Sequence, residues 1–483
     1  MEDNELIAVR RRKLEELRSR GVAPFGQAYA VDGPIQQLRE QFQVGSKVRL
    51  AGRITAHRNM GKSQFLDLSD LTGRLQIYVN LKELTPDQVE IFQLLDLGDF
   101  LGVTGECFIT KMGEPTVRVT DFTVLTKTLR PLPDKWHGVS DVEIQYRQRY
   151  LDLVANPQSR LVFRQRIEIV RRIRLFLHER DFLEVETPMM QGIAGGAAAQ
   201  PFQTYHNALD LDLYLRIAPE LYLKRLLVGG FSKVFELNRN FRNEGISRRH
   251  NPEFTMLEAY WAYADFELVA NLVEELVCYL AEHIASGLQI EHRTESGEVR
   301  RTINLARPWR RARYRDLIES ADSNWFQRSR ADKLTRCREL GVEVRDGMAD
   351  FEITQQVFEK LVEEKTIDPL FVTHLPMELV PLAKQNTDDQ STVDVFELII
   401  NGQEIAPGYS ELNDPIVQRE RLLAQAGEET QKIDEDFLLA LEHGMPPAGG
   451  FGLGIDRLTM LLTGADSIRD VILFPHLKPK SQE

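Results

Sequence analysis

The spacing of hydrophobic residues predicts a helix at the start of the chain and a small β-domain after it. Residues 4–20 place aliphatic side chains at helical intervals among charges, and Gly21 and Pro24 follow. The pattern then changes to short strand-like runs with glycine turns, at 48–54, 65–68, 74–79, 100–104 and 116–125. This succession favours a small barrel, and the OB-fold is the natural candidate.

A second pattern begins after a turn-rich segment. Residues 131–152 combine prolines, a glycine and basic residues, so we predict a hinge there. Helical spacing returns at 158–180 and 268–286, with strand-like runs at 182–188 and 233–237. Because no strand–helix–strand unit repeats, we expect an α+β fold in which helices flank an antiparallel sheet. Residues 287–350 contain no motif that indicates a function.

Length, charge and cysteine content limit the class of protein. A chain of 483 residues is too long for one ordinary core, so we expect at least two domains. The net charge of −13 disfavours indiscriminate nucleic-acid binding, so any RNA contact must be local. Three widely spaced cysteines disfavour a disulfide framework, and no apolar run reaches the roughly 20 residues of a membrane span. We therefore expect a cytoplasmic protein without a membrane segment.

Two distant segments combine residue types that bind phosphate with types that stack on a purine. The first, 241–254, contains Arg242, Glu244, Arg249 and Phe254, and the second, 450–457, ends a glycine run with Asp-Arg. The glycines would let the backbone approach a ligand closely. Taken alone, the first segment is more often a surface salt-bridge region. Together the two segments favour an ATP-activating site.

Three glutamates follow one another at intervals of seven residues: Glu397, Glu404 and Glu411. If some of them converge, their oxygens suit Mg²⁺ beside phosphates. The alternative is a set of exposed acids on a hairpin at the edge of a sheet. The absence of lysines among them makes simple surface ion pairing a weaker explanation, but both interpretations remain open at this stage.

Segments 241–254 and 450–457 resemble motifs 2 and 3 of the class II aminoacyl-tRNA synthetases. The helix, strand and proline of 158–188 resemble motif 1. Further matching segments at 146–153, 184–190, 215–225 and 410–415 extend the resemblance to the bacterial lysyl-tRNA synthetases over nearly the full length. It implies an N-terminal helix plus OB-fold anticodon-binding domain (1–130), a hinge (131–152) and a class II catalytic domain (153–483). It also implies a homodimer, formed through motif 1.

The resemblance implies a role for each matching residue. The enzyme would join L-lysine to tRNA(Lys) at the expense of ATP, with Mg²⁺ as cofactor and Arg242, Glu244 and Arg457 as its catalytic residues. The implied ligand contacts are, for ATP, Arg242, Arg249, His250, Asn251, Phe254, Gly454 and Arg457; for lysine, Gly196, Glu220, Glu258, Tyr260, Tyr409 and Glu411; for the metal, Glu397 and Glu404; and for the anticodon, Arg53, Phe65 and Gln76.

Three positions depart from the pattern of that family. Gln200 and Val395 stand where arginine is expected, and Pro407 stands where many members have an asparagine that meets the amino acid. Proline provides neither a side-chain amide nor a backbone donor, so the contacts to the amino acid should differ there. Two other functions compatible with the sequence are a paralogue that transfers activated lysine to a different acceptor and an RNA-binding relative without activation. Retention of the first domain disfavours the former, and the intact ATP motifs disfavour the latter.

Overall fold

The computed structural model describes residues 2–132, 141–197, 199–285, 287–294, 296–345, 347–426 and 433–479. The chain divides into two compact units, residues 1–160 and 161–483, which are described separately below. The predicted hinge at 131–152 lies partly outside the described residues, because 133–140 are not among them. Its later part contains α4 (Val142–Arg147) and the beginning of α5 (Arg149–Ala155).

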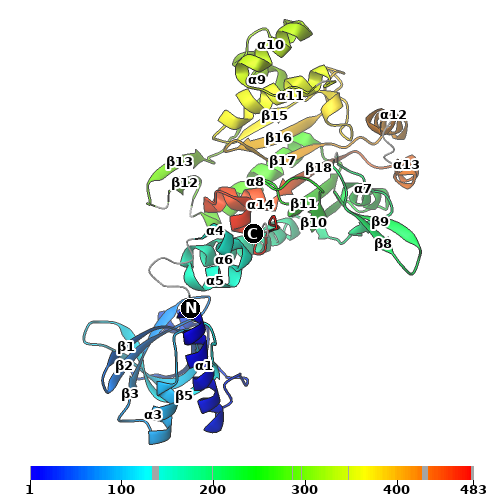
Figure 1. The fold of residues 1–483 in the computed structure, drawn as a ribbon. Coiled ribbons are helices and arrows are strands. Elements are labelled where there is room, and N and C mark those ends of the chain that lie inside the picture. Colours follow the sequence, from blue (N-terminus) through cyan, green and yellow to red (C-terminus); the bar gives the residue numbers. More distant parts are fainter. Residues whose placement is uncertain are drawn as a thin grey trace. The chain divides into compact units, whose positions relative to one another are not determined.

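The first unit is built around a closed barrel (Figure 1), which confirms the barrel predicted from the short strands. Along the strands, buried aliphatic residues such as Leu66 and Leu68 alternate with outward-facing ones such as Phe65. The predicted N-terminal helix is also confirmed, as α1 (Glu2–Ser19). The barrel strands, in spatial order, are β1 (Lys47–Met60), β2 (Ser63–Ser69), β3 (Arg74–Asn80), β5 (Pro115–Thr126) and β4 (Phe100–Ile109); the unit also contains α2 (Ile35–Glu40) and α3 (Pro86–Gln93).

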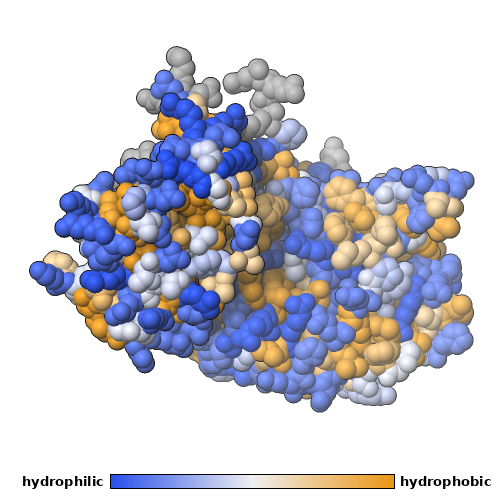
Figure 2. Space-filling model, turned by 90° about the horizontal axis from the view of Figure 1, so that it is seen from below, coloured by the Kyte–Doolittle hydropathy of each residue, from blue (hydrophilic) through white to orange (hydrophobic). Residues whose placement is uncertain are grey.

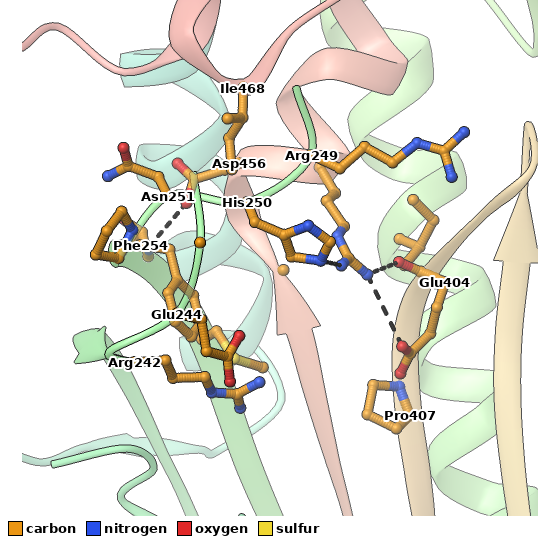
Figure 3. Close-up of a pocket in the computed structure, with 17 residues that line it drawn as sticks. Arg242, Glu244, Arg249, His250, Asn251, Phe254, Glu404, Pro407, Asp456 and Ile468 are labelled. Atoms are coloured by element: carbon orange, nitrogen blue, oxygen red, sulfur yellow. Dashed lines mark hydrogen bonds and ion pairs between the residues drawn. The ribbon is translucent and has the colours of Figure 1, made fainter. Parts of the chain in front are cut away.

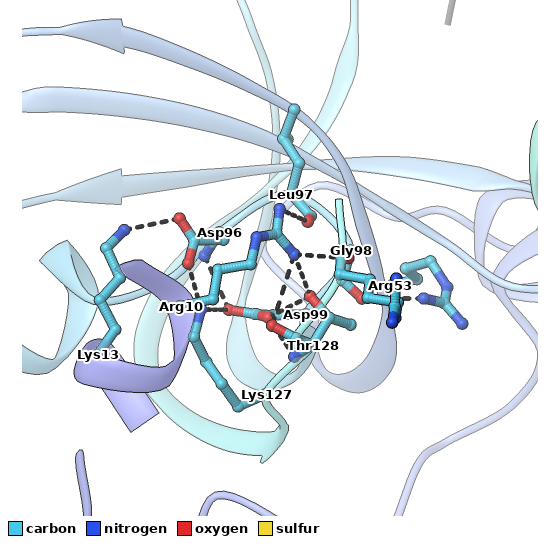
Figure 4. A network of polar contacts seen from close by, with 10 residues as sticks. Arg10, Lys13, Arg53, Asp96, Leu97, Gly98, Asp99, Lys127 and Thr128 are labelled. Carbon is cyan, nitrogen blue, oxygen red and sulfur yellow. Dashed lines mark hydrogen bonds and ion pairs between the residues drawn. The ribbon is translucent and has the colours of Figure 1, made fainter. Parts of the chain in front are cut away.

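A buried network of charged groups fixes α1 to the barrel (Figure 4). Arg10 of α1 donates to the Thr128 hydroxyl at 2.7 Å, and Thr128 donates in turn to Asp99 at 2.8 Å. Lys127 is fully buried and pairs with Asp99 at 2.8 Å and also with Asp96. Because a buried charge is tolerated only when it is paired, this network specifies where the helix docks.

The second unit is organised by a large sheet that is antiparallel except for the outer pairs β14/β15 and β10/β6 (Figure 1). The strand predicted at 182–188 is shorter than expected, because beyond Glu184 the chain follows β10 through the Val185 N–H and the Thr187 hydroxyl instead of a regular ladder. The strands, in order across the sheet, are β14 (Arg310–Arg313), β15 (Leu370–Thr373), β16 (Val395–Ile400), β17 (Gln403–Ser410), β18 (Ala448–Gly454), β11 (Glu253–Ala262), β10 (Lys233–Phe241) and β6 (Leu183–Glu184).

Helices pack on this sheet and close its core. The predicted helices at 158–180 and 268–286 are confirmed as α6 (Pro157–His178) and α8 (Phe266–Ile284). The apolar side of α8, including Val273 and Leu276, joins the main core with Phe371 and Phe396 of the sheet. The remaining helices of the unit are α7 (Glu220–Val228), α9 (Tyr314–Ala321), α10 (Arg330–Leu340), α11 (Asp350–Leu361), α12 (Pro415–Ala426), α13 (Glu435–Glu442), α14 (Ile455–Thr463) and α15 (Ile468–Val471).

Two smaller sheets and three 3₁₀ turns complete the described part of the second unit. One small sheet pairs β12 (Gln289–Arg293) with β13 (Val299–Asn304), and the other contains β7 (Met190–Gln191), β9 (Leu211–Leu215) and β8 (Gln203–His206). Figure 2 shows hydrophobic residues interspersed with hydrophilic ones over one face of the molecule. Within the described residues, every helix is too short or too polar to cross a membrane.

Candidate active site

Strand β11 provides one continuous row of side chains for the site. Alternate residues of a strand point to opposite faces, and Leu257 and Ala259 are buried in the main core on one face. The other face therefore presents Phe254, Met256, Glu258 and Tyr260 in order along the strand. Phe254 and Met256 line one pocket, and Glu258 and Tyr260 belong to a second group of polar residues beside it.

The first pocket encloses about 170 Å³ and brings together all seven residues that the sequence assigns to ATP (Figure 3). They come from the loop after β10, from β11, and from the junction of β18 with α14. Figure 3 shows Arg242 and Glu244 across the pocket from Glu404 and Pro407. The lining also includes residues that the sequence did not indicate: Thr255, Met256, Ile405, Asp456 and Ile468.

Arg242 is prepared to receive an anion. Its guanidinium lies 5.0 Å from the centre of the Phe254 ring, and its Nε atom is buried without a hydrogen-bond partner in the described part of the chain. Burial lowers the pKa of Arg242, although Glu244 and Glu258 favour its charged form. An unsatisfied buried donor on a cation costs free energy until an acceptor arrives, so this position favours a phosphate or carboxylate.

Arg457 faces the pocket from the opposite side. It donates to the Glu404 carbonyl at 2.8 Å, and its Nη2 lies 3.3 Å from Nε2 of His250. Burial and the charge of Arg457 lower the pKa of His250, so the neutral ring can accept this hydrogen bond. Arg249 donates to the carbonyl of Gly402 at 3.1 Å. The pocket thus contains three arginines and an aromatic ring, the set that the sequence predicted for a nucleotide.

Asp456 connects this pocket to helix α6. Its carboxylate accepts the Thr255 N–H at 2.8 Å and pairs with Arg166 of α6 at 2.6 Å. Asp456 is nearly fully buried, so these contacts fix the first turn of α14. Arg457 is the next residue, and its position therefore depends on a helix whose main role in the fold is packing.

The three evenly spaced glutamates do not converge on one point. Glu397 and Glu404 lie on neighbouring strands β16 and β17, whereas Glu411 lies beyond β17 in the other pocket. Burial raises the pKa of Glu397 well above its usual value, and Glu404, Glu363 and Glu359 raise it further. The alternative of an edge hairpin is wrong, because β16 and β17 are internal strands of the sheet. Within the described residues, no group of three or more His, Cys, Asp or Glu side chains could hold a metal.

The residues that the resemblance assigns to lysine form a second, buried cluster, called the second or acidic pocket below. Glu220 begins α7, Tyr409 is on β17, and the hydroxyl of Tyr409 donates to Oε1 of Glu220 at 2.7 Å. Glu411 is 1% exposed, and its Oε1 has no hydrogen-bond partner among the described residues. Lys224, which the sequence did not single out, lies between these acids, 2.7 Å from Glu220 and 2.6 Å from Glu411.

Glu258 completes this acidic pocket. Its carboxyl group accepts from the Tyr260 hydroxyl at 3.3 Å, and burial together with Glu220 raises the pKa of Glu258 to about 8. Gly196 adopts a positive φ of +87°, and a Cβ there would lie 3.3 Å from Cβ of Glu220. A buried set of acids with too few cations is suited to an ammonium ligand.

On the barrel, the predicted RNA contacts share the outer face of the strands but differ in availability. Phe65 is half-buried and lies 5.0 Å from Tyr78, and Gln76 is on the neighbouring strand, where it accepts a hydrogen bond from Thr116. Arg53 instead donates to the Gly98 carbonyl at 3.1 Å (Figure 4). Its guanidinium also stacks on Phe100. To contact RNA, Arg53 must therefore use the N–H groups that do not bind the Gly98 carbonyl, or release that carbonyl.

Comparison with known families decides the class of this site. Residues 141–478 match the family described as tRNA synthetases class II (D, K and N), and residues 48–125 match the OB-fold nucleic acid binding domain. The chain belongs to the class II tRNA synthetases. The expected α+β fold, with an OB-fold followed by a class II synthetase domain, is thereby confirmed.

Proteins named lysine–tRNA ligase are similar to this synthetase over its whole length. It is 51% identical to the one from Carboxydothermus hydrogenoformans, over 99% of each chain. It is 49% identical to the one from Syntrophomonas wolfei, over 99% of this chain and 98% of the relative. It is 45% identical to the one from Staphylococcus aureus, over 99% of each chain.

The departures from the family pattern have different surroundings in this synthetase. Pro407 lies opposite Glu397 in the β16–β17 pairing and lines the nucleotide pocket. Val395 is buried opposite Tyr409, so a neutral side chain suits its surroundings. Gln200 uses its backbone carbonyl to accept the Asn243 N–H at 2.8 Å, a contact that any residue type provides. Of the three positions, Pro407 is the one that lines the described nucleotide pocket.

Proposed function

We propose that this synthetase activates L-lysine with ATP and transfers the lysyl group to the 3′ end of tRNA(Lys). The observation that supports the substrate is the cluster of Glu220, Glu258 and Glu411. It adjoins the nucleotide pocket through β11, which carries Glu258 next to Phe254 and Met256 of that pocket. An aspartate substrate would meet three carboxylates there, whereas the two ammonium groups of lysine would be matched by them. The names of the relatives agree with this choice.

In the proposed activation step, the lysine carboxylate attacks the α-phosphorus of ATP. The bond from that phosphorus to the bridging oxygen breaks, and pyrophosphate leaves with the electron pair. Arg242 would bind both the carboxylate and the α-phosphate, with Glu244 beside it, and so neutralise the charge that builds up between them. Arg249 would bind the terminal phosphate. No side chain acts as a nucleophile, so catalysis is positioning and electrostatics.

The nucleotide pocket would hold adenine between an aromatic ring and a guanidinium. Phe254 and Arg457 both line the pocket, and Arg457 is held by the Glu404 carbonyl. His250, Asn251 and Gly454 line the same pocket. Asn251 donates its side-chain amide to the Glu253 carbonyl at 2.6 Å, so its contribution would be to hold the loop in place.

Glu397 and Glu404 fit a divalent cation bound together with phosphates. Burial and then repulsion from neighbouring acids, first Glu404, raise the pKa of Glu397, and a bound cation would favour its charged form. Two carboxylates are too few to hold Mg²⁺ alone, and this ion usually takes its other ligands from substrate phosphates and water. When bound, Mg²⁺ would neutralise phosphate charge and orient the pyrophosphate as a leaving group.

The barrel would bind the anticodon. Phe65 and the neighbouring Tyr78 form an aromatic surface on the outer face of the barrel, and Arg118 lies 5.9 Å over the Tyr78 ring. An unpaired base that stacks on such a ring gains about 1–3 kcal/mol. Gln76 would read a base edge, and Arg53 would contribute the donors that Gly98 leaves free. Such an RNA-binding surface favours tRNA over any other acceptor.

A homodimer and a cytoplasmic location complete the proposal. Helix α6 and the segment after it expose large apolar side chains, led by Ile167 at 63% exposure and Met190 at 57%. Exposed apolar surface of this kind is typical of subunit interfaces. The three cysteines are free and buried, which agrees with a reducing compartment where tRNA is charged.

The direct test is ATP–pyrophosphate exchange by the purified protein with Mg²⁺ and without tRNA. Lysine should support exchange, and arginine, ornithine, asparagine and aspartate should not. Addition of tRNA(Lys) should then yield lysyl-tRNA, which is measured by acid-precipitable radioactive lysine. No exchange with any amino acid, in a protein shown to be folded, would refute the proposal.

A further inference from the structure

The acidic pocket contains its own cation, and its surroundings are unusual for a lysine. Lys224 is fully buried on α7, with its Nζ between Oε1 of Glu220 and Oε2 of Glu411. The ammonium also lies 5.5 Å from the centre of the Tyr409 ring. Burial lowers the pKa of Lys224, but the adjacent Glu220 and Glu411 outweigh burial, so the pKa is raised and the ammonium stays charged.

We propose that Lys224 is a positioning residue for amino-acid selection, which holds Glu220 and Glu411 apart and limits the negative charge that the pocket offers to a substrate. This inference rests on the proposed function, because it concerns how the same pocket chooses lysine. Nothing else in the described part of the second pocket is cationic and bonded to both acids.

The geometry of the bridge indicates how it acts. The Lys224 ammonium and the Tyr409 hydroxyl both bind Oε1 of Glu220, so they use one oxygen of that carboxylate and leave the other. On Glu411 the ammonium forms an ion pair with Oε2 at 2.6 Å, whereas Oε1 has neither an ion pair nor a hydrogen bond to the described residues. One oxygen of each acid is therefore fixed from inside the protein, and the other remains for a ligand.

The charges of the pocket support the same assignment. Once Glu258, whose pKa is raised to about 8, has released its proton, the pocket holds three carboxylates, Glu220, Glu258 and Glu411, and one ammonium, Lys224, so two negative charges remain for a ligand. Lysine has two ammonium groups, and its carboxylate would be met by Arg242. Without Lys224, three mutually close acids would face the substrate, and their repulsion would make them hold a further proton at neutral pH, beyond the one that Glu258 already holds. The internal cation thus adjusts the pocket to a dicationic amino acid.

An opposite role is conceivable on electrostatic grounds, since an internal ammonium could compete with the ammonium of the substrate. The burial of Lys224 and its fixation to two elements, α7 and the end of β17, favour a permanent bridge. The two roles predict opposite changes. Removal of a competitor would strengthen lysine binding, whereas removal of the bridge would weaken it.

The test compares full-length Lys224→Met and Lys224→Gln with Lys127→Met. Lys127 is a matched control, because it is also fully buried and also pairs with two carboxylates, but in the barrel. ATP–pyrophosphate exchange gives separate KM values for lysine and ATP between pH 7 and 8.5. We expect the lysine KM of both Lys224 variants to rise about tenfold at pH 7, equivalent to about 1.4 kcal/mol, with little change in the KM for ATP.

Dependence on pH separates a charge effect from a general structural defect. Lys224 contacts Glu220 on the same helix and Tyr409 and Glu411 from β17 and its end. Glu258 and Tyr260 of β11 interact electrostatically with these acids. The excess in lysine KM should shrink toward pH 8.5, as the surplus proton leaves these acids. Lys127→Met should lower the melting temperature and leave the KM for lysine unchanged.

Each possible outcome supports or overturns a specific statement. An unchanged or lower lysine KM in the Lys224 variants would overturn the positioning role. A parallel rise in the KM for lysine and for ATP, independent of pH, would also overturn it. Lys224→Gln provides a second folded variant if Lys224→Met is unstable, because its amide can still donate to Glu220. Wild-type protein that fails to exchange with lysine would refute the proposed function itself.

Discussion

Gly450 on β18 is the position where one added methyl group should weaken the binding of lysine without changing the binding of ATP. It pairs with Tyr260 of β11 and with Tyr409 of β17, so it lies between the two tyrosines of the acidic pocket. A Cβ at Gly450 would lie 2.6 Å from Cδ1 of Tyr260 and even closer to Oε1 of Glu411. Neither group can retreat freely, because both are buried.

The expected magnitude follows from what the methyl group displaces. Movement of the Glu411 carboxylate removes one charge-assisted hydrogen bond to the substrate, which is worth about 1.5–3 kcal/mol. Gly450→Ala should therefore raise the lysine KM by roughly 10- to 150-fold. Overpacking should also lower the free energy of unfolding by about 1–3 kcal/mol. The nucleotide pocket does not include Gly450, so the KM for ATP should change little.

A matched control lies two residues further along the same strand. A Cβ at Gly452 would come close only to the end of the flexible Met256 side chain, at 2.9 Å, and would make ordinary contacts at 3.9 Å with Glu258 and Pro407. Gly452→Ala should leave the KM for lysine within about twofold of wild type, since Met256 can change rotamer. Pyrophosphate exchange measures both constants, and urea unfolding measures stability. A folded Gly450→Ala protein with the lysine KM of wild type would refute the reasoning.

Three further predictions concern other parts of the molecule. Burial and Glu220 raise the pKa of Glu258 to about 8, so lysine binding below that pH must expel a proton. The KM for lysine should therefore fall about tenfold per pH unit from pH 6.5 to 7.5 and level off above pH 8. A KM that does not change with pH would contradict this. Phe65→Ala should raise the KM for tRNA, because it removes about 1–3 kcal/mol of base stacking. It should leave ATP–pyrophosphate exchange without tRNA unchanged, so aminoacylation and exchange are measured in parallel. Arg166→Ala should lower the free energy of unfolding in urea by about 3–5 kcal/mol, because it leaves Asp456 buried without its ion pair, and a loss under 1 kcal/mol would show that the pair is dispensable.

The barrel and the nucleotide pocket could be predicted from the sequence because their signals are local. Each barrel strand alternates between the core and the outside, and the arginines and Phe254 stand in short contiguous motifs. The structure needed only to bring two such motifs together across β11 and β18. The assigned roles of the individual residues remain predictions, since geometry shows proximity and not chemistry.

The acidic pocket could be predicted only in part, because burial is decided by the tertiary fold. Glu220 and Lys224 are four residues apart on a helix, a spacing that usually indicates an exposed ion pair. Nothing in the sequence showed that this pair is buried against Glu411, 187 residues after Lys224. The position of β16 and β17 inside the sheet was also undetermined, so Glu411 could not be distinguished from an exposed acid.

Residues 287–350 were not interpretable for a related reason. Strand β13 (Val299–Asn304) exposes all its side chains except that of Ile303, so it lacks the alternation that reveals a strand. Its order depends on pairing with β12, which local sequence does not report. Where most side chains face water, the hydrophobic pattern carries little information about the fold.

The pleat of β11 has a consequence for how amino-acid choice can change in this enzyme. Successive side chains on one face of a strand are about 6.6–6.8 Å apart. The strand therefore fixes the spacing between the side chains of Phe254, Met256, Glu258 and Tyr260. Substitution of one of these side chains leaves the positions of the others unchanged. Insertion of a single residue would instead turn the remaining row toward the core. New amino-acid preferences can therefore arise by substitution at positions 258 and 260 alone. An insertion or deletion within β11 would instead disrupt the nucleotide pocket and the acidic pocket together.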